Sequence, residues 1–486
     1  MPIDLRLLVT EMATGALALV VLGVDLIWPR LGGKRLGIIT AIGAAAILLV
    51  TFLRRGVIGD TFGGLYLADS YAVFFRLLFL AAATLVALAS ADFVQREVRR
   101  PGEYYALLLF SVTGFMLMAG AGDLLTLYLG LELGTISLYP LAGYLKGQPR
   151  SGEAGIKFMI IGAVSSATLL YGISLVYGSL GTTAFAGVRE GLSQAALALG
   201  RGMLLPEAPL ALGIAFIIAG FGFKMVAAPF HMWAPDVYHG APTPITAYLS
   251  VASKAAGFAV VGRVFLGPLL DASPQWWVVL AGLSFASMLY GNLVAIPQTN
   301  IKRMLAYSGI AQAGYILVGL AAVSAFGAAT TLFYLLQYTF TNIGAFIVVT
   351  VVAQATGRED IAGYRGLSRR SPGLGFALLL LFLSLGGIPP LSGFWAKLYV
   401  FAAGIQQGLW WLVTLGVLTT VMSLYYYLMV IKQAYFYAAD ADASPIAIPR
   451  PAGLALFICT IAILALAYPG PALSLATKAV QRFFGG

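Results

Sequence analysis

The chain has 486 residues, of which 60% are hydrophobic and 10% are charged. Soluble domains carry about 25% charged residues, so this composition excludes a soluble globular protein and indicates a chain that crosses a membrane many times. The formal net charge of +10 would fit a nucleic-acid partner, but its distribution among the loops argues against one.

Apolar runs of about 20 residues predict an all-α fold with about fourteen membrane spans. In chain order we expect them at 8–29, 36–53, 68–92, 103–121, 123–144, 155–180, 209–233, 244–267, 276–296, 304–323, 327–354, 374–403, 408–437 and 451–469. No A-x-A-like site follows the first run, so we expect no cleavable signal peptide. We also expect no soluble domain between the spans.

An even number of spans places both termini on one side, and the basic residues of the loops are unequal between the two faces. The face opposite the termini collects sixteen: Arg30, Lys34, Arg35, Arg96, Arg99, Arg100, Lys146, Arg150, Lys302, Arg303, Arg358, Arg365, Arg369, Arg370, Lys432 and Arg450. The face with the termini has eight: Arg6, Arg54, Arg55, Arg189, Arg201, Arg263, Lys478 and Arg482. The positive-inside rule therefore predicts external termini and a cytoplasmic face rich in arginine. The positive charge is a topology signal and predicts no nucleic-acid partner.

Several ionisable residues fall inside the expected spans. The basic ones are Arg76, Lys157, Lys224, Lys254 and Lys397, and Glu132 lies near the middle of its run. A charge at mid-bilayer costs roughly 2.5–3.5 kcal/mol and commonly marks a path for ions or protons. We therefore expect Lys224, Lys254 and Lys397 to be functional, together with Glu132.

The remaining charges near the spans have simpler explanations. Lys157 is near the start of its span, so it either contributes to function or is an interfacial lysine whose ammonium reaches the headgroups. We expect Arg76 to anchor or to form a structural pair, and Glu11 and Asp25 to be interfacial. Buried lysines suit a proton relay, because burial lowers their pKa and a nearby carboxylate raises it again. Sodium would favour clustered oxygens, so the residues favour protons.

Two spans carry interruptions. A straight helix from 209 to 240 would be about 46 Å long, whereas the hydrocarbon core is about 30 Å thick; we therefore expect a break near Pro229, where proline removes a backbone hydrogen bond. The second interruption is LGGIPPLSGFWAK at 385–397. Irregular backbone at that depth must be buried in protein or line a wet cavity.

The two breaks share a weak likeness, PFHMWA at 229–234 and PLSGFWA at 390–396, in spans that run in opposite directions. This favours an inverted repeat with a site at the breaks, although two unrelated proline kinks would look similar. His231 lies beside the first break and is a candidate for proton transfer. We expect His239 to have a structural role at the cytoplasmic rim.

Familiar cofactor motifs are missing from the sequence. The single cysteine, Cys459, excludes an internal disulfide and a Cys-ligated iron–sulfur cluster. Neither a G-x-G-x-x-G nor a Walker sequence occurs, and His231 and His239 have no nearby cysteine to complete a zinc site. We expect neither cofactor nor metal in this chain, so an ion gradient or a partner must drive it.

The segments around these charges resemble the antiporter-like subunit N family of proton-pumping NADH:quinone oxidoreductase, respiratory complex I. They are FGFKMVAAPFHMWAPDVYHGAPTPITAYLSVASKAAGFAV (221–260), NIKRMLAYSGIAQAGYILVG (300–319), GGIPPLSGFWAKLYVF (386–401) and LTLYLGLELGTISLYPLAGY (125–144). The resemblance covers essentially the whole chain.

The resemblance implies a role for each matching position. Glu132 resembles the glutamate that pairs with the seventh-span lysine, here Lys224, and Lys157 resembles the lysine that modulates this pair. Lys254 resembles the central lysine, which His231 joins to the uptake half of the path, and Lys397 resembles the lysine of the exit half. One departure is Gln312, where many members carry histidine, and this leaves the tenth-span link open.

The resemblance also implies an organisation. Residues 1–102 would hold spans 1–3, residues 103–267 a first repeat of spans 4–8, residues 276–437 an inverted second repeat of spans 9–13, and residues 451–486 the last span. Spans 7 and 12 would be the broken helices.

The implied function is a proton channel in the membrane arm of complex I, in a bacterial inner membrane. NADH, FMN, iron–sulfur clusters and quinone would be bound by partner subunits, and M-like and small K/J/A-like subunits and lipids would contact this chain. Two alternatives remain: an Mrp-type cation/proton antiporter subunit, and a structural spacer that pumps nothing.

Overall fold

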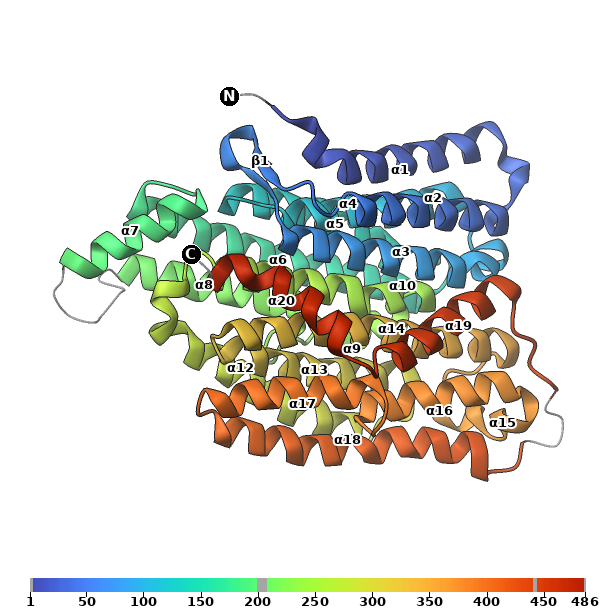
Figure 1. Ribbon diagram of the computed structural model, residues 1–486. Helices are drawn as coiled ribbons and strands as arrows, with labels where there is room; N and C mark the ends of the chain where they lie inside the picture. Colours follow the sequence, from blue (N-terminus) through green and yellow to red (C-terminus); the bar gives the residue numbers. More distant parts are fainter. Residues whose placement is uncertain (1–2, 199–207, 440–443, 485–486) are drawn as a thin grey trace.

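The structure is a computed structural model that describes residues 3–198, 208–439 and 444–484. The described residues form a bundle of helices with one short β-hairpin (Figure 1). The first half contains η1 (Leu5–Leu8), α1 (Val9–Ile27), η2 (Pro29–Leu31), α2 (Gly33–Leu53), β1 (Gly59–Thr61), η3 (Phe62–Gly64), β2 (Tyr66–Ala68), α3 (Ser70–Glu97), α4 (Pro101–Ala119), α5 (Leu124–Ala142), α6 (Pro149–Leu180), α7 (Phe185–Ala198), α8 (Ala208–Met225), α9 (Ala234–Gly240), α10 (Thr243–Tyr248), η4 (Leu249–Ser253) and α11 (Lys254–Phe265). The second half contains η5 (Leu270–Ala272), α12 (Ser273–Ala295), α13 (Ile301–Ala321), α14 (Ala325–Thr356), η6 (Ile361–Tyr364), α15 (Leu367–Arg370), α16 (Pro372–Gly386), α17 (Ser392–Gln406), α18 (Trp410–Phe436), α19 (Arg450–Ala465) and α20 (Gly470–Phe484).

The predicted all-α membrane fold is confirmed. Twelve helices in the described part of the chain are each long and apolar enough to cross a membrane, and the bent pair α19–α20 would make thirteen. Helices α16 and α17 have 15 residues each, about 22 Å, so they are too short to cross singly but follow each other across a break. The total of fourteen spans stays a prediction.

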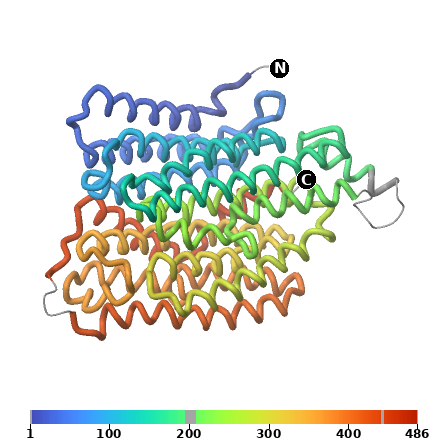
Figure 2. The backbone as a smooth tube through the Cα atoms, turned by 180° about the vertical axis from the view of Figure 1, so that it is seen from behind, coloured from blue at the N-terminus to red at the C-terminus, as the bar shows by residue number. Residues whose placement is uncertain are grey.

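The long helices run side by side, with α1 and α2 along one edge and α17 and α18 along the other (Figures 1 and 2). Helix α14 lies in the interior, where it contacts α3, α10, α16, α17, α19 and α20. The segment Thr243–Phe265 is entirely buried among its neighbours. This segment contains Lys254, so that residue lies at the centre of the molecule.

Both expected breaks are present. Helix α8 ends at Met225 and α9 begins at Ala234, with Pro229 between them. Helix α16 ends at Gly386, where Gly387 adopts a positive φ of 80°, and α17 begins at Ser392. A third irregularity was not expected from the sequence: η4 is a π-helical turn that ends immediately before Lys254. Such turns frequently accompany functional sites.

Two elements near the termini were also not expected. Strands β1 and β2 pair antiparallel, with Asp60 opposite Leu67. Helix α20 bends away from α19 by 87° and lies against α3 and α14. The guanidinium of Arg482 pairs with Asp69 at 2.9 Å, and the ring of Phe483 lies 5.0 Å from that of Tyr71. Ionic and aromatic contacts therefore fasten α20 to the bundle.

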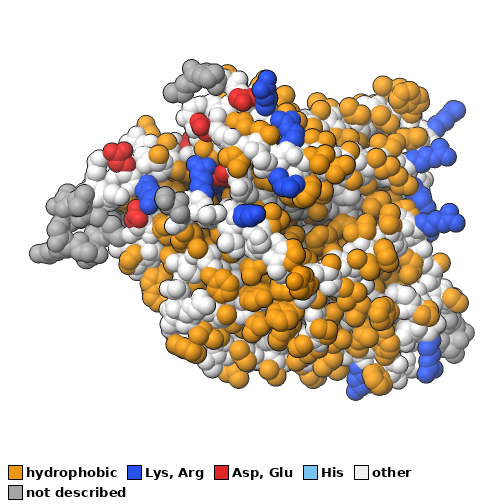
Figure 3. Space-filling view, viewed as in Figure 1, with side chains coloured by type: hydrophobic (Ala, Val, Ile, Leu, Met, Phe, Trp, Pro, Cys, Tyr) orange, Lys and Arg blue, Asp and Glu red, His pale blue; other side chains and the backbone are white. Residues whose placement is uncertain are grey.

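In the face that Figure 3 shows, the lysine and arginine side chains at the end opposite the two termini have no acidic side chains beside them, whereas those nearer the termini lie among acidic ones. The end opposite the termini is therefore the more positive one in this view, which fits the excess of basic loop residues there in the sequence. One assignment was wrong, because Arg263 belongs to no loop: it is buried in α11, where it bonds Asp69 at 2.5 Å. Arg201 lies outside the described residues.

Glu11 lies in the first turn of α1, and its interfacial depth stays a prediction. Its carboxylate is buried and accepts a bond of 2.6 Å from Arg76, which also bonds the hydroxyl of Tyr66. This is the structural pair expected for Arg76. Asp25 accepts the backbone N–H of Gly102 at 3.0 Å and so caps the start of α4.

Candidate functional site

The first candidate group joins the end of α8 to the middle of α5. Lys224 is buried in the last turn of α8, and its Nζ donates to the hydroxyl of Thr135 on α5 at 2.6 Å. Glu132 lies one turn earlier on α5 and accepts a bond of 2.5 Å from Ser166 on α6. Both side chains are described, and they form no direct ion pair. The two ionisable groups are thus neighbours, each held by a hydroxyl.

Lys157 belongs to a separate cluster at the end of the bundle opposite the termini. Its Nζ pairs with Glu153 and with Asp236 on α9, both at 2.7 Å. Asp236 also pairs with Arg303 on α13 at 2.8 Å. Burial raises the pKa of the Asp236 carboxyl, but the bonds from Lys157 and Arg303 outweigh this and hold it below its ordinary value. The structure therefore places Lys157 in a surface ion network that links α6, α9 and α13.

His231 is buried in the break between α8 and α9. Its ring lies 4.5 Å from that of Tyr290 on α12, and its Nδ1 has no hydrogen-bond partner among the described residues. In the described part of the chain, His231 forms no hydrogen bond to Lys224 or Lys254. The structure thus brings His231 to the first break without connecting the two lysines through it.

Lys254 is fully buried at the start of α11. Its Nζ donates to the carbonyl of Gly309 on α13 at 2.6 Å and to the hydroxyl of Tyr338 on α14 at 3.2 Å. A side chain on Gly309 would meet the ammonium at 2.9 Å. Glycine at this position therefore leaves room for the lysine to reach the backbone of α13.

Lys397 lies beside the second break. The residue is buried in α17, and its Nζ donates to the carbonyl of Gly386 at 3.3 Å, which is the last residue of α16. The ammonium also lies 4.7 Å from the ring centre of Tyr315 on α13. The carbonyl is free to accept because the helix ends there. The break thus supplies the partner for Lys397.

A cluster of hydroxyl and amide groups, which we call the tenth-span cluster, lies between Lys254 and Lys397. It consists of Ser308, Gln312, Tyr334 and Tyr427. The hydroxyls of Ser308 and Tyr427 are 2.5 Å apart, and the amide nitrogen of Gln312 donates to Tyr427 at 3.3 Å and to the carbonyl of Leu385 at 3.2 Å. Tyr334 donates to the amide oxygen of Gln312.

At each end of this cluster, the neighbouring residue in the sequence is a glycine whose carbonyl bonds one of the two lysines. Ser308 precedes Gly309, whose carbonyl bonds Lys254. Leu385 precedes Gly386, whose carbonyl bonds Lys397. The buried groups therefore form a nearly continuous polar row through the second half of the molecule.

Comparison with known proteins fits this arrangement. The family described as NADH:quinone oxidoreductase/Mrp antiporter, TM, matches residues 121–423. A protein of Heliobacterium modesticaldum named NADH-quinone oxidoreductase subunit N is 44% identical and is matched over 99% of this chain and 100% of its own length. The chain belongs to this subunit N family.

Solved structures agree with the assignment. A chain of respiratory complex I from Thermus thermophilus with bound aureothin superposes with a TM-score of 0.79 at 33% identity, covering 96% of this chain and 99% of that one. A chain of the Mrp complex from Dietzia sp. superposes with a TM-score of 0.86 at 18% identity, covering 98% and 97%. The second likeness shows a shared fold alone, so the full-length sequence match favours subunit N over an Mrp subunit.

In this member of the subunit N family, a polar cavity of about 570 Å³ opens at the end opposite the termini. Lys302 lines it, pairing with Glu359 at 3.2 Å and donating to the carbonyl of Ala241 at 3.0 Å. Burial lowers the pKa of His239 on the rim, and the charge of Lys302 lowers it further. The cavity also touches Thr243, the first residue of the buried segment that leads to Lys254.

Sequence reasoning missed most of the groups that hold the ionisable residues of this chain in place. Thr135, Ser166 and Tyr427 are hydroxyl residues in apolar runs, where they are common, and their partners lie 89, 34 and 115–119 residues away. Asp236 could have been found from the sequence, because it is an acidic residue that directly follows Pro235 in the segment after the first break.

Proposed function

We propose that this chain carries a proton-translocation path within the membrane arm of complex I. The observation that carries the proposal is the row of buried amines Lys224, Lys254 and Lys397, which lie along the polar interior of a subunit N fold. Burying three ammonium groups without a directly bonded carboxylate is costly. Such a cost is reasonable where the groups must gain and lose protons.

The proposed path has two halves. In the first, a change in the interaction between Lys224 and Glu132 pushes a proton toward Lys254, with Lys157 and His231 as modulating groups. In the second, the proton crosses the tenth-span cluster to Lys397 and leaves on the external face. Gln312 would take part in this step through Tyr427, which supplies a hydroxyl route where a histidine is missing.

The polar cavity beside Lys302 would supply the protons. Between the cavity and Lys254, the amide nitrogen of Asn342 donates to the hydroxyl of Ser250 at 2.6 Å. Ser250 is four residues before Lys254, about one helical turn. This arrangement supports uptake from the arginine-rich face, which we place in the cytoplasm by the positive-inside rule.

The same proposal includes the organisation of the molecule and its partners. Segments α4–α11 and α12–α18 would be the two inverted repeats, each with a break in its fourth span. Quinone reduction, with its NADH, FMN and iron–sulfur clusters, would occur in other subunits, and M-like and small K/J/A-like subunits would flank this chain in the bacterial inner membrane.

The decisive experiment measures protons pumped per electron by the intact complex in proteoliposomes. We expect Lys254→Gln to lower the ratio, because a neutral amide cannot carry the proton, whereas Lys432→Gln, an exposed lysine of α18, should leave it unchanged. An unchanged ratio in Lys254→Gln would favour the structural spacer. Sodium–proton exchange by the purified chain alone would favour an Mrp-type antiporter.

A further inference from the structure

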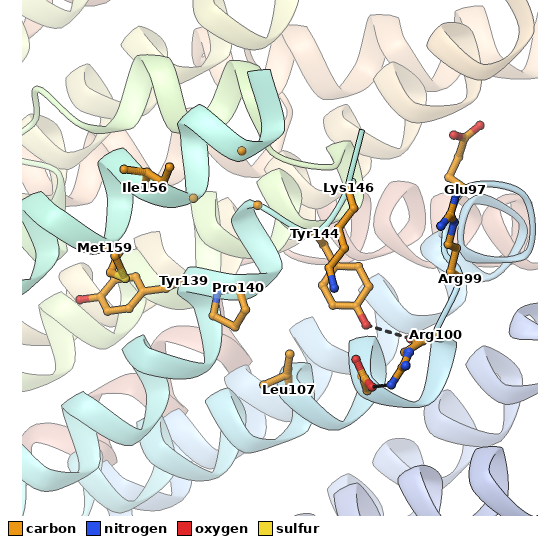
Figure 4. Close-up of a pocket in the computed structure, with 14 residues that line it drawn as sticks. Glu97, Arg99, Arg100, Leu107, Tyr139, Pro140, Tyr144, Lys146, Ile156 and Met159 are labelled. Atoms are coloured by element: carbon orange, nitrogen blue, oxygen red, sulfur yellow. Dashed lines mark hydrogen bonds and ion pairs between the residues drawn. The ribbon is translucent and has the colours of Figure 1, made fainter. Parts of the chain in front are cut away.

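A second cavity, of about 720 Å³, lies on the outer side of the bundle between the ends of α3, α4, α5 and α6 (Figure 4). Its lining changes character with depth. The outer part is charged and contains Glu97, Arg99, Arg100, Glu103 and Lys146, and the inner part is apolar and contains Leu107, Pro140, Ile156 and Met159. It is separate from the buried lysines of the proposed proton path.

The depth of the lining follows from the helices that carry it. Arg99 and Lys146 belong to the connections before α4 and before α6. Met159 is ten residues beyond the first residue of α6, about 15 Å along its axis. The cations therefore lie at the level of the lipid headgroups, and the exposed side chains of Ile156 and Met159 lie at the level of the acyl chains.

The charges of the outer part are only partly satisfied within the chain. Arg100 pairs with Glu103 at 2.7 Å, and the hydroxyl of Tyr144 donates to the carbonyl of Arg100 at 2.9 Å, which holds this connection in place (Figure 4). Arg99 and Lys146 are exposed and form no ion pair in the described part of the chain. Three cations against two carboxylates leave the lining with a net charge of +1.

We propose that this cavity binds a glycerophospholipid, with the phosphate between Arg99 and Lys146 and the start of an acyl chain against Ile156 and Met159. A phospholipid has the same order of charge and apolar surface as the lining, and basic pockets between membrane helices are known to hold lipid headgroups. A free anion would leave the apolar part uncovered. An apolar helix of a partner would leave both cations without a counter-charge.

The lining also favours one kind of headgroup. A net charge of +1 matches a single phosphate better than the two phosphates of cardiolipin, and Glu97 is exposed beside the cations and can accept the ammonium of an ethanolamine. We therefore expect phosphatidylethanolamine to refill the cavity of the delipidated protein to a higher occupancy than cardiolipin does. A higher occupancy for cardiolipin would contradict the proposed headgroup arrangement.

The main experiment counts the tightly bound phospholipids of the intact complex by native mass spectrometry. We expect the double variant Arg99→Gln/Lys146→Gln to lose one phospholipid per chain. The matched control is Arg30→Gln/Arg35→Gln, which removes two exposed cations from the same loop face away from the cavity. An unchanged lipid count in the first variant would overturn the proposal, as would loss of a neighbouring subunit with the lipid count unchanged.

A second variant tests the apolar part. Met159→Trp adds bulk to an outward-facing side chain and should fill the inner cavity without disturbing the core, so the thermal unfolding temperature should be that of the wild type. We expect this variant also to lose one phospholipid. Full retention would place the acyl chain elsewhere and overturn the proposal.

Discussion

At the scale of single residues, the buried amines bond to neutral oxygens. Lys224 donates to a threonine hydroxyl, and Lys254 and Lys397 donate to backbone carbonyls. A neutral acceptor holds the amine in place without fixing its charge as a directly bonded carboxylate would. This geometry suits a group that exchanges a proton, because the amine keeps its position in both states.

The burial of these lysines inside membrane spans could be predicted from the sequence, and the groups around them could not. A charged residue inside an apolar run of about 20 residues is easily seen in the sequence, and Lys254 is an example. Tyr427 is one of three consecutive tyrosines at 425–427, and the sequence gives no reason to prefer it. Only the packing of α18 against α13 and α16 selects the tyrosine that reaches Gln312.

The tyrosine triplet also offers a test of the tenth-span cluster. We expect Tyr427→Phe to lower the protons pumped per electron by the intact complex, because it removes the hydroxyl that joins Ser308 to Gln312. Tyr425→Phe is the matched control, since Tyr425 is exposed on the outside of the same helix. Equal ratios in the two variants would show that the proton bypasses Tyr427. Gln312→His should keep the wild-type ratio.

At the scale of elements, the prolines and glycines of the sequence located both breaks correctly. The break after α8 was expected near Pro229, and the break after α16 at the paired glycines and prolines. The π-turn before Lys254 left no such mark, because LSVAS contains neither proline nor glycine. Helix α20 was missed because its polar residues prevent a continuous apolar run after residue 469. These polar residues lie on one side of an amphipathic helix, a pattern that a search for apolar runs does not detect.

Helix α5, which carries Glu132, is held in place by its close packing against α4. A side chain on Gly114 would lie 2.2 Å from the backbone nitrogen of Gly134, two residues after Glu132. Small residues allow membrane helices to approach in this way. The helix pair is therefore a sensitive support for the first half of the proposed path.

We expect Gly114→Ala to lower the free energy of unfolding by about 1–3 kcal/mol, the usual effect of overpacking, because the backbone of α5 cannot move aside cheaply. Gly282→Ala is the control: it lies within α12 and has open space around the added methyl group, so it should be neutral or stabilising by up to about 1 kcal/mol. Unfolding by SDS in mixed micelles measures both. Equal stability of the two variants would contradict the packing argument.

At the scale of the whole molecule, helix α14 and an ionic connection are among the contacts that join the halves of the chain. Helix α14 contacts elements of both halves in the interior, and Asp236 joins Lys157 of α6 to Arg303 of α13 at the arginine-rich end. The division into two halves was expected from the resemblance to subunit N. The ionic connection was not, because its three residues are far apart in the sequence.

This connection predicts a pH dependence. The carboxyl of Asp236 has a pKa below its ordinary value of 3.8, so its stabilising effect is complete above pH 3.8 and is lost as the pH falls through the lower folded-state pKa. At neutral pH we expect Asp236→Asn to lower stability by about 0.2–1 kcal/mol for each of the two partly exposed pairs. The difference in thermal unfolding temperature between wild type and variant, measured from pH 7 downward, should be constant above pH 3.8 and shrink below it. A difference that stays constant below pH 3.8 as well would show that the pairs contribute nothing.

The orientation of the whole molecule is open to a direct test, because Cys459 is the single cysteine of the sequence and is fully buried. The natural chain should therefore react poorly with maleimides. Arg30 and Gly56 are exposed residues at opposite ends of α2, so cysteines introduced at the two positions must lie on opposite faces of the membrane, and the buried Cys459 should not react. With the termini outside, we expect Gly56→Cys to react with an impermeant maleimide in intact cells and Arg30→Cys to react only after the membrane is opened. The reverse pattern would place the arginine-rich face outside, and proton uptake through the cavity beside Lys302 would then start from the wrong side.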